Sequence, residues 1–149
     1  MRSLAEPADA DYAARVRASF ARQAAMELIG ARLDSVAPGL VTITLKHDAR
    51  LTQQHGFLHA GIVATALDSA CGYAASTLMP ADAGVLTIEF KINLLAPARG
   101  PDFHFEGRVV KAGRTISVVD GRATQTDGSL VATMTATIMT VIGRTGIHQ

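Results

Sequence analysis

One acidic side chain, Asp68, lies in the middle of an apolar segment that runs from Ala60 to Ala75. The richness of this segment in Ala, Leu, Ile and Val predicts a buried helix, and a polar loop with a glycine, residues 53–58, precedes it. A carboxylate inside such a helix costs free energy unless it is hydrogen-bonded, paired or hydrated. A carboxylate that is held at such a position is suited to act as a general base.

A structural interpretation of the same helix competes with the catalytic one. Its polar residues and a glycine recur every three or four positions, as on the solvent-facing side of an amphipathic helix: Thr65, Asp68, Ser69, Gly72 and Ser76. The helix contains no Lys, Arg or Glu, however, and a solvated stripe of this length normally carries several. The composition favours a functional carboxylate, and the amphipathic interpretation stays open.

The start of the same helix offers a second chemical group. Backbone N–H groups in the first turn of a helix have no partner within the helix, and the positive end of the helix dipole lies beside them. His59, Ala60 and Gly61 occupy this position. Such N–H groups can hold the oxygen of a reacting carbonyl. Together with a base at Asp68, they predict attack on an acyl group.

These two groups are too far apart to act together within one chain. Ala60 and Asp68 are separated by eight residues of helix, a rise of about 12 Å. Both cannot contact one carbonyl carbon. We therefore expect a dimer in which two antiparallel neighbouring helices place each Asp68 opposite Ala60 of the other subunit.

The patterns before the apolar helix predict a helix and two strands. Asp11 is suited to begin a helix that continues to about Leu28, and Gly30 is suited to end it. A short strand is expected at 31–36. Strict alternation of apolar and polar residues predicts another at 41–46.

Everything after Gly84 is predicted to be β-structure, in four strands that form an antiparallel meander: 86–95, 103–110, 115–124 and 130–142. In the first of these strands, apolar residues at even positions alternate with Thr87 and other polar residues at odd positions, which predicts two faces of opposite character. A strongly twisted sheet can wrap an apolar helix that needs burial on all sides. The fold class expected is α+β.

Composition describes one compact domain, residues 1–149, with loose ends expected at 1–10 and 143–149. A hydrophobic content of 48% with 18% charged residues excludes a disordered chain, and the formal net charge of +1 gives no reason to expect nucleic acid as a partner. No secretory signal and no apolar run long enough to cross a membrane are present. We expect a cytoplasmic protein that does not associate with membranes.

The single cysteine, Cys71, lies within the apolar helix and is expected to be a buried core residue. It cannot form an internal disulfide. No Cys/His spacing matches a zinc site, so neither a metal nor another cofactor is expected.

A short motif and the order of elements together resemble a known family. His59-Ala60-Gly61, with an acid nine residues after the histidine, is similar to the His-Gly-Gly signature and following Asp of the hotdog-fold thioesterases, in particular the phenylacetyl-CoA thioesterase-like (PaaI-type) branch. The resemblance extends from the N-terminal helix to the strand at 86–95 and the turn at 111–115. It implies a hotdog fold, in which a twisted antiparallel sheet wraps a long central helix, here with an extra N-terminal helix. It also implies dimers that can pair into tetramers.

The resemblance implies roles for individual residues. Asp68 corresponds to the acid that acts as general base or nucleophile, and Ala60 to the residue whose N–H polarises the thioester carbonyl. Gln53 corresponds to an Asn or Gln that lines the site, and Thr87 falls near a Ser or Thr that orients the attacking water in some members. The family usually has Gly at the position of Ala60. The N–H group is retained here, but the methyl group is expected to narrow the acyl pocket.

The implied substrate is an acyl-CoA thioester with an aromatic or medium-chain acyl group, so that coenzyme A is part of the substrate and not a cofactor. Loop and helix residues are expected to line its pocket: Gln54, His55, Phe57, Leu58, Ile62 and Tyr73. Basic residues near the turns of the meander are expected either to hold the phosphates of coenzyme A or to form a solvated rim: Arg99, Arg108, Lys111 and Arg114.

The histidines divide by position. His59 is expected to position the loop or to contact the substrate, and His55 to act in the same way but more weakly. The others are expected to be surface residues: His47, His104 and His148.

Two other functions use the same residues. A hotdog hydratase or dehydratase would pair a catalytic His59 with Asp68. A non-catalytic module would bind acyl-CoA without changing it.

Overall fold

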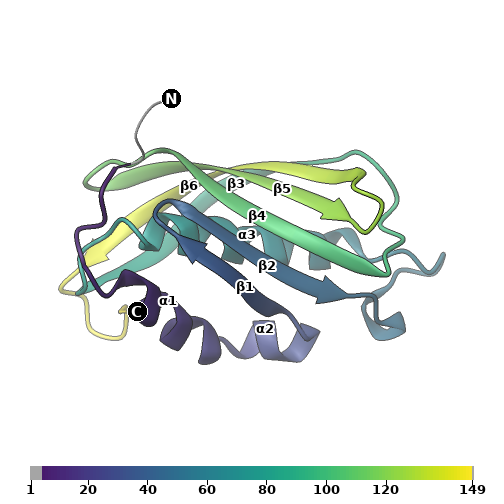
Figure 1. Cartoon of the computed structure of the whole chain (residues 1–149), viewed down its shortest axis with the longest axis horizontal. Coiled ribbons are helices and arrows are strands. Elements are labelled where there is room, and N and C mark those ends of the chain that lie inside the picture. The colour runs from purple at the N-terminus through teal and green to yellow at the C-terminus, as the bar shows by residue number, and fades with distance from the viewer. Residues whose placement is uncertain (1–4, 149) are drawn as a thin grey trace.

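A six-stranded antiparallel sheet curls around one long helix, α3 (Ala60–Ser76), in the computed structural model, which describes residues 5–148 (Figure 1). The predicted apolar helix and the α+β class are thus confirmed. In chain order the strands are β1 (Arg32–Ala37), β2 (Leu40–Lys46), β3 (Ala83–Leu94), β4 (Asp102–Lys111), β5 (Ile116–Gln125) and β6 (Leu130–Ile142).

The order of strands in the sheet, β1-β2-β4-β5-β6-β3, corrects the predicted meander. The last three strands do form one, but β3 pairs with β6 at the edge of the sheet, and β2 pairs with β4. Alternation of side chains predicts which segments are extended. It carries no information about which strands become neighbours. Here α3 connects β2 to β3, and the separation of these two strands in the sheet lets the sheet surround the helix from both sides.

Two glycines of the sheet lie at its closest contact with α3. Gly107 of β4 and Gly121 of β5 are directly opposite each other in the sheet. A Cβ atom at Gly107 would overlap the carbonyl oxygen of Ala70, and one at Gly121 would press on the side chains of Cys71 and Leu67. The absence of side chains here lets the helix pack directly on the backbone of the sheet. Cys71 is buried at this contact, as predicted.

The predicted N-terminal helix is interrupted. It forms two helices, α1 (Tyr12–Ala21) and α2 (Ala24–Ile29), because Gln23 adopts an extended conformation. The Oε1 atom of Gln23 accepts a hydrogen bond from the hydroxyl of Ser69 in α3. The apolar pattern continues through the break and so does not reveal it. Gly30 ends α2 with φ of 76°, as predicted.

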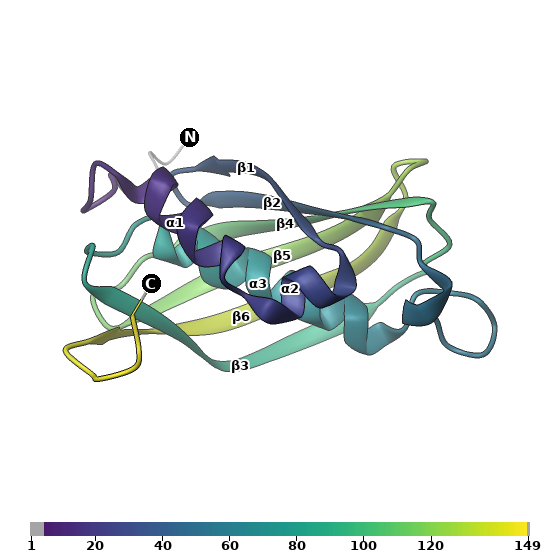
Figure 2. The same ribbon diagram turned by 90° about the horizontal axis from the view of Figure 1, so that it is seen from below.

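These two helices lie along the side of α3 that faces away from the sheet (Figure 2). Arg15 of α1 donates hydrogen bonds to the hydroxyl and carbonyl of Ser76 and to the carbonyl of Met79, at 3.0 to 3.2 Å. Together with the Gln23–Ser69 contact, this buries Ser69, Gly72 and Ser76, whereas Thr65 and Asp68 remain partly exposed. The interpretation of the whole stripe as a solvated face is therefore wrong.

None of the helices within residues 5–148 is long and apolar enough to cross a membrane.

Candidate active site

Asp68 of α3 and Thr87 of β3 are in direct contact. The hydroxyl of Thr87 donates a hydrogen bond to Oδ1 of Asp68 at 2.7 Å. Asp68 is partly buried and faces two hollows in the surface, so its second carboxylate oxygen is available to a bound molecule. The structure therefore brings together two of the residues that sequence reasoning placed in the site.

A β-bulge makes this contact possible. Strict alternation predicts that Thr87 and Phe90 lie on opposite faces of β3. The register between β3 and β6 shifts between Thr87 and Glu89, so that Thr87 pairs with the buried residue Ile138 and Phe90 with the buried residue Ala136. Both residues consequently lie on the face of the strand that is turned toward α3. The extra residue redirects Thr87 to Asp68, as bulges beside functional sites often do.

The start of α3 has one N–H group available. The N–H of Gly61 donates to Nδ1 of His59 at 2.8 Å, and the N–H of His59 donates to the carbonyl of Leu51 at 2.9 Å. Among residues 5–148, no acceptor bonds to the N–H of Ala60. Of the three N–H groups that the sequence indicated, the geometry leaves that of Ala60 to hold a carbonyl oxygen. His59 acts here as the N-cap of the helix.

The loop before α3 is held by hydrogen bonds from neighbouring segments. The ring Nε2 of His47 bonds to the carbonyl of Gly56 at 2.9 Å, and the N–H of Leu58 donates to the carbonyl of Ala98 at 3.0 Å. His47 is exposed, as expected, but it positions the loop, a role the sequence did not indicate. Gln53 turns its side-chain oxygen to the N–H of His55 within the loop and lines neither hollow that Asp68 faces.

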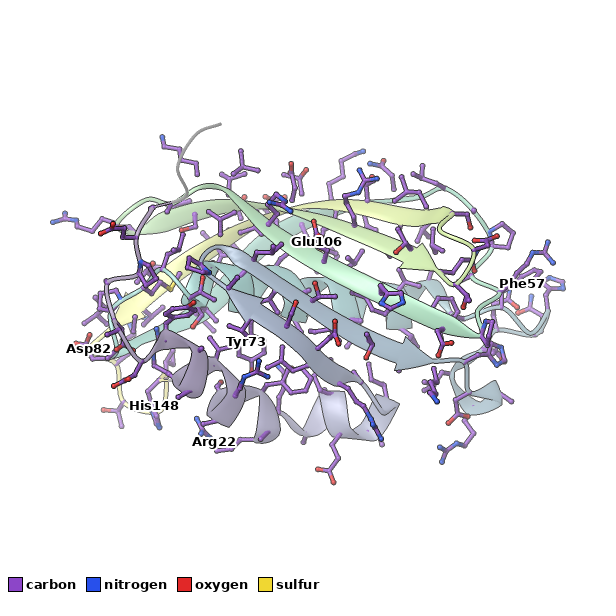
Figure 3. The ribbon with its side chains drawn as sticks, in the orientation of Figure 1. Arg22, Phe57, Tyr73, Asp82, Glu106 and His148 are labelled. Atoms are coloured by element: carbon purple, nitrogen blue, oxygen red, sulfur yellow. The ribbon has the colours of Figure 1, made fainter. Side chains whose placement is uncertain are left out.

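The larger hollow beside Asp68 has a volume of about 480 Å³ and lies between α3, the α1–α2 junction and β3. It is lined by Ser19, Arg22, Gln23, Asp68, Ser69, Gly72, Tyr73, Val85, Leu86, Thr87 and His148. Arg22 comes from the junction of α1 and α2, Tyr73 from α3 and His148 from the C-terminal segment (Figure 3).

The smaller hollow, of about 310 Å³, follows α3 from Asp68 back to Gly61 beneath α2. The predicted loop residues Gln54, His55, Phe57 and Leu58 line neither hollow. Phe57 instead forms a cation–π contact with Arg99, whose guanidinium lies 4.9 Å from the centre of the ring. Ile62 lines a third hollow, of about 370 Å³, with His59, Gly61 and Arg50 at the start of α3.

The basic residues do not form one cluster within a chain. Arg99 adjoins the loop before α3, whereas Lys111 and Arg114 lie at the other end of β4 (Figure 1). The strand between them is ten residues long, which corresponds to about 33 Å. Arg108 forms an ion pair with Glu106 of the same strand, with 3.4 Å between Nε and Oε1.

No group of three or more His, Cys, Asp or Glu side chains within residues 5–148 is placed to hold a metal ion. Burial raises the pKa of the Cys71 thiol to about 12, and the charges of Asp68 and Asp120 add to the effect. The cysteine is therefore a protonated core residue and not a nucleophile.

Residues 55–132, which contain most of the loop, α3 and strands β3 to β5, match the family model of the thioesterase superfamily. The chain belongs to this superfamily. The resemblance seen in the motif and element order is thus confirmed, and membership supports thioester hydrolysis as the reaction.

Relatives of this superfamily member agree in fold and sequence. A thioesterase family protein from Silicibacter pomeroyi is 56% identical, with a TM-score of 0.85 over 89% of this chain and 99% of that one. A protein of Saccharolobus solfataricus with a provisional esterase name is 36% identical over 104 residues, 70% of this chain and 69% of its own length. The PaaI protein of E. coli has a TM-score of 0.80 over 93% and 96% of the two chains; at 19% identity it shares the fold. The hotdog fold is confirmed.

Sequence reasoning missed the contribution of the N-terminal helices to the site of this superfamily member. Ser19, Arg22 and Gln23 line the larger hollow, although they lie more than 40 residues before Asp68 in the chain. The conformational break at Gln23 and its contact with Ser69 depend on tertiary packing. No local pattern signals them.

Proposed function

We propose that this superfamily member hydrolyses acyl-CoA thioesters at a site shared between two subunits. The observation that carries the proposal is that α3 presents two reactive groups at different positions. Its start presents the free N–H of Ala60, which can bind the carbonyl oxygen of a thioester, and its middle presents the carboxylate of Asp68, bonded to Thr87, which can act as base or nucleophile. The rise of about 12 Å along the helix keeps the two halves of one chain apart.

The exposed strand β3 supports a dimer. Within the described residues it pairs only with β6, and its other edge is open. Its apolar side chains are 41 to 54% exposed: Leu86, Ile88, Phe90 and Leu94. Open apolar edges favour pairing with another strand. A second copy paired antiparallel along β3 would cover these side chains and set the two α3 helices antiparallel, with Asp68 of one near Ala60 of the other.

The proposed reaction begins with the thioester carbonyl oxygen accepting a hydrogen bond from the N–H of Ala60. In the general-base form, Asp68 of the other subunit removes a proton from water as the water oxygen bonds to the carbonyl carbon. The C–S bond then breaks, and the thiolate of coenzyme A takes the proton. In the nucleophilic form, a carboxylate oxygen of Asp68 bonds to the carbonyl carbon as the C–S bond breaks, which releases the thiolate of coenzyme A and leaves an anhydride. Water then hydrolyses the anhydride, and the thiolate takes the proton that the water releases. Thr87 orients the carboxylate in both forms.

Cations at the start of α3 are proposed to hold the phosphates of coenzyme A. Arg99 lies over the ring of Phe57, and Arg50, which is paired with Asp48 at 2.6 Å, lines the third hollow with His59. Charge reversal at Arg99 should raise KM for acyl-CoA and change the hydrolysis of short acyl-thiol analogues much less. Lys111→Glu, at the other end of β4, is the comparison. Equal losses on both substrate types at Arg99 would contradict this assignment.

The decisive experiment measures release of free thiol from aryl- and alkyl-CoA thioesters by the wild type and by a folded Asp68→Asn variant. The rate should fall by about two orders of magnitude or more in the variant. Asp120→Asn, on the exposed face of β5, is the control and should retain the wild-type rate. Equal rates in Asp68→Asn would refute the catalytic role. Bound acyl-CoA that stays intact would favour a binding module, and addition of water to an enoyl thioester would favour a hydratase.

Mixing of subunits tests whether the site is shared. Ala60→Pro and Asp68→Asn variants, each inactive alone, are combined, and formation of mixed dimers is verified by mass spectrometry. A shared site gives each mixed dimer one site with both defects and one with neither, so a random mixture should regain about a quarter of wild-type activity. No regained activity would refute the shared site.

A further inference from the structure

The larger hollow begins at the proposed reacting carboxylate and extends along α3. Asp68 and Thr87 line one part of it, and Gly72 and Tyr73, about one helical turn further along α3, line another. A Cβ atom at Gly72 would meet only Val85, at 3.9 Å, so the space beside this glycine is open. A volume of about 480 Å³ is within the usual range for a pocket that binds a small organic group.

The wall at Tyr73 is polar, because the hydroxyl of Tyr73 is 3.1 Å from that of Ser19. Nearer to Asp68 the wall is polar too, because Ser69 donates to Oε1 of Gln23 at 3.0 Å. A pocket for a plain hydrocarbon chain would have apolar walls, because polar groups lose water when such a chain covers them. The acyl group that fits this wall carries polar atoms at the end remote from the thioester.

The charge of Arg22 indicates which polar group this is. Its guanidinium donates one hydrogen bond, from Nη1 to the carbonyl of Ala18 at 3.1 Å, and forms no ion pair with any carboxylate of residues 5–148. Burial raises the pKa of Tyr73, while the hydrogen bond between Tyr73 and Ser19 and the positive charge of Arg22 act in the opposite direction. Arg22 and Tyr73 line the same hollow, and the guanidinium has further donors beside the one bonded to Ala18.

We infer that the larger hollow is the acyl pocket and that Arg22 selects acyl groups with a carboxylate at the end remote from the thioester. This inference rests on the proposed function. Guanidinium and carboxylate form paired, charge-assisted hydrogen bonds, and Ser19 and Tyr73 can supply a further donor. The substrate class is the CoA thioester of a dicarboxylic acid. Its thioester end lies at Asp68 and its free carboxylate at the α1–α2 junction.

Three thioesters with the same six-carbon chain test the inference: hexanoyl-CoA, 6-hydroxyhexanoyl-CoA and adipyl-CoA. The wild type should show a kcat/KM for adipyl-CoA about tenfold or more above that for hexanoyl-CoA. Arg22→Gln removes the charge and should lower kcat/KM for adipyl-CoA about tenfold more than for hexanoyl-CoA. Arg17→Gln is the matched control, because Arg17 is an exposed arginine of the same helix that does not line the hollow.

A binding measurement separates failure of this inference from failure of the proposed function. Calorimetry with the Asp68→Asn protein, with and without Arg22→Gln, gives the Kd of each thioester without turnover. Tighter binding of adipyl-CoA that Arg22→Gln abolishes supports the carboxylate site even if no thioester is hydrolysed. Hydrolysis of all three thioesters at similar rates would overturn the inference and leave the proposed function intact. A preference for 6-hydroxyhexanoyl-CoA over adipyl-CoA would also overturn it.

Discussion

Thr87 donates its hydroxyl proton to Oδ1 of Asp68 across 2.7 Å, and this bond joins the edge strand β3 to the central helix α3. It occupies one carboxylate oxygen of Asp68, a residue that lines both hollows, and restricts the rotation of the carboxylate. In the proposed reaction Thr87 is a positioning residue for Asp68. The contact exists only because the bulge after Thr87 turns this side chain to the inner face of the sheet.

Replacement of Thr87 by Val, which has the same shape without the hydroxyl, should lower kcat about ten- to a hundredfold and change KM little, since one hydrogen bond to a charged group contributes roughly 1.5 to 3 kcal/mol. Steady-state thiol release measures the effect. Thr87→Ser keeps the hydroxyl and should recover most of the rate. A Val variant with wild-type kcat would show that the bond has no catalytic consequence.

The N–H of Ala60 can be removed without breaking the helix. Ala60 is the first residue of α3, where proline is tolerated, and His59 before it has φ of −60° and ψ of 137°, the extended conformation that proline requires of its neighbour. Ala60→Pro should therefore fold and lose about 10²- to 10³-fold in kcat. Ala60→Gly retains the N–H and is the control. Circular dichroism verifies folding, and a Pro variant with unchanged kcat would exclude this N–H as the oxyanion donor.

The chemically informative part of the fold could be predicted from a few local patterns. The apolar run from Ala60 predicts α3, because a segment this rich in Ala, Leu, Ile and Val must be buried. The alternation at 41–46 predicts β2 with nearly its observed bounds. Features that depend on long-range packing could not be predicted from the sequence. The edge position of β3, its bulge and the break at Gln23 leave the local hydrophobic pattern unchanged. For this reason Thr87 entered the site through family resemblance, and Arg22 was not foreseen.

Arg15 is expected to be a major stabilising residue of the N-terminal helices. Its side chain is only 10% exposed, and it donates to the carbonyl of Ser76 at the end of α3, to that of Met79 after the helix, and to the carboxylate of Asp9. Arg15→Met should lower the free energy of unfolding by roughly 2 kcal/mol or more, because the carbonyls lose their donors. Urea denaturation measures this change. The exposed Arg17→Met should alter stability by less than about 0.5 kcal/mol, and equal effects would contradict the assignment.

Cys71 should report unfolding and make stability depend on alkaline pH. Because burial raises the pKa of its thiol from about 9 to about 12, the folded protein should not react with a thiol reagent at pH 8 until it unfolds. The contribution to stability is complete below about pH 9 and decreases as the pH rises toward 12, because only the unfolded chain then releases the proton. Urea midpoints at pH 7.5 and 10 measure this dependence, and Cys71→Ala should reduce it. Rapid labelling of the folded protein would contradict the prediction.

Gly72 is predicted to hold space for the acyl group at the expense of stability. A glycine inside a helix costs about 0.5 to 1 kcal/mol relative to alanine, and a methyl group here would make only an ordinary contact with Val85. Gly72→Ala should therefore raise the melting temperature by about 1 to 4 °C. Gly107→Ala, whose methyl would overlap the backbone of α3, should lower it.

The methyl group of Gly72→Ala projects into the larger hollow, so kcat/KM for bulky aryl-CoA thioesters should fall severalfold more than that for acetyl-CoA. A variant that is more stable but selectively impaired on large acyl groups would mean that the glycine serves the substrate and not the fold. If all thioesters were hydrolysed at the wild-type rate, the larger hollow could not be the acyl pocket, and the smaller hollow beneath α2 would be the alternative route from Asp68.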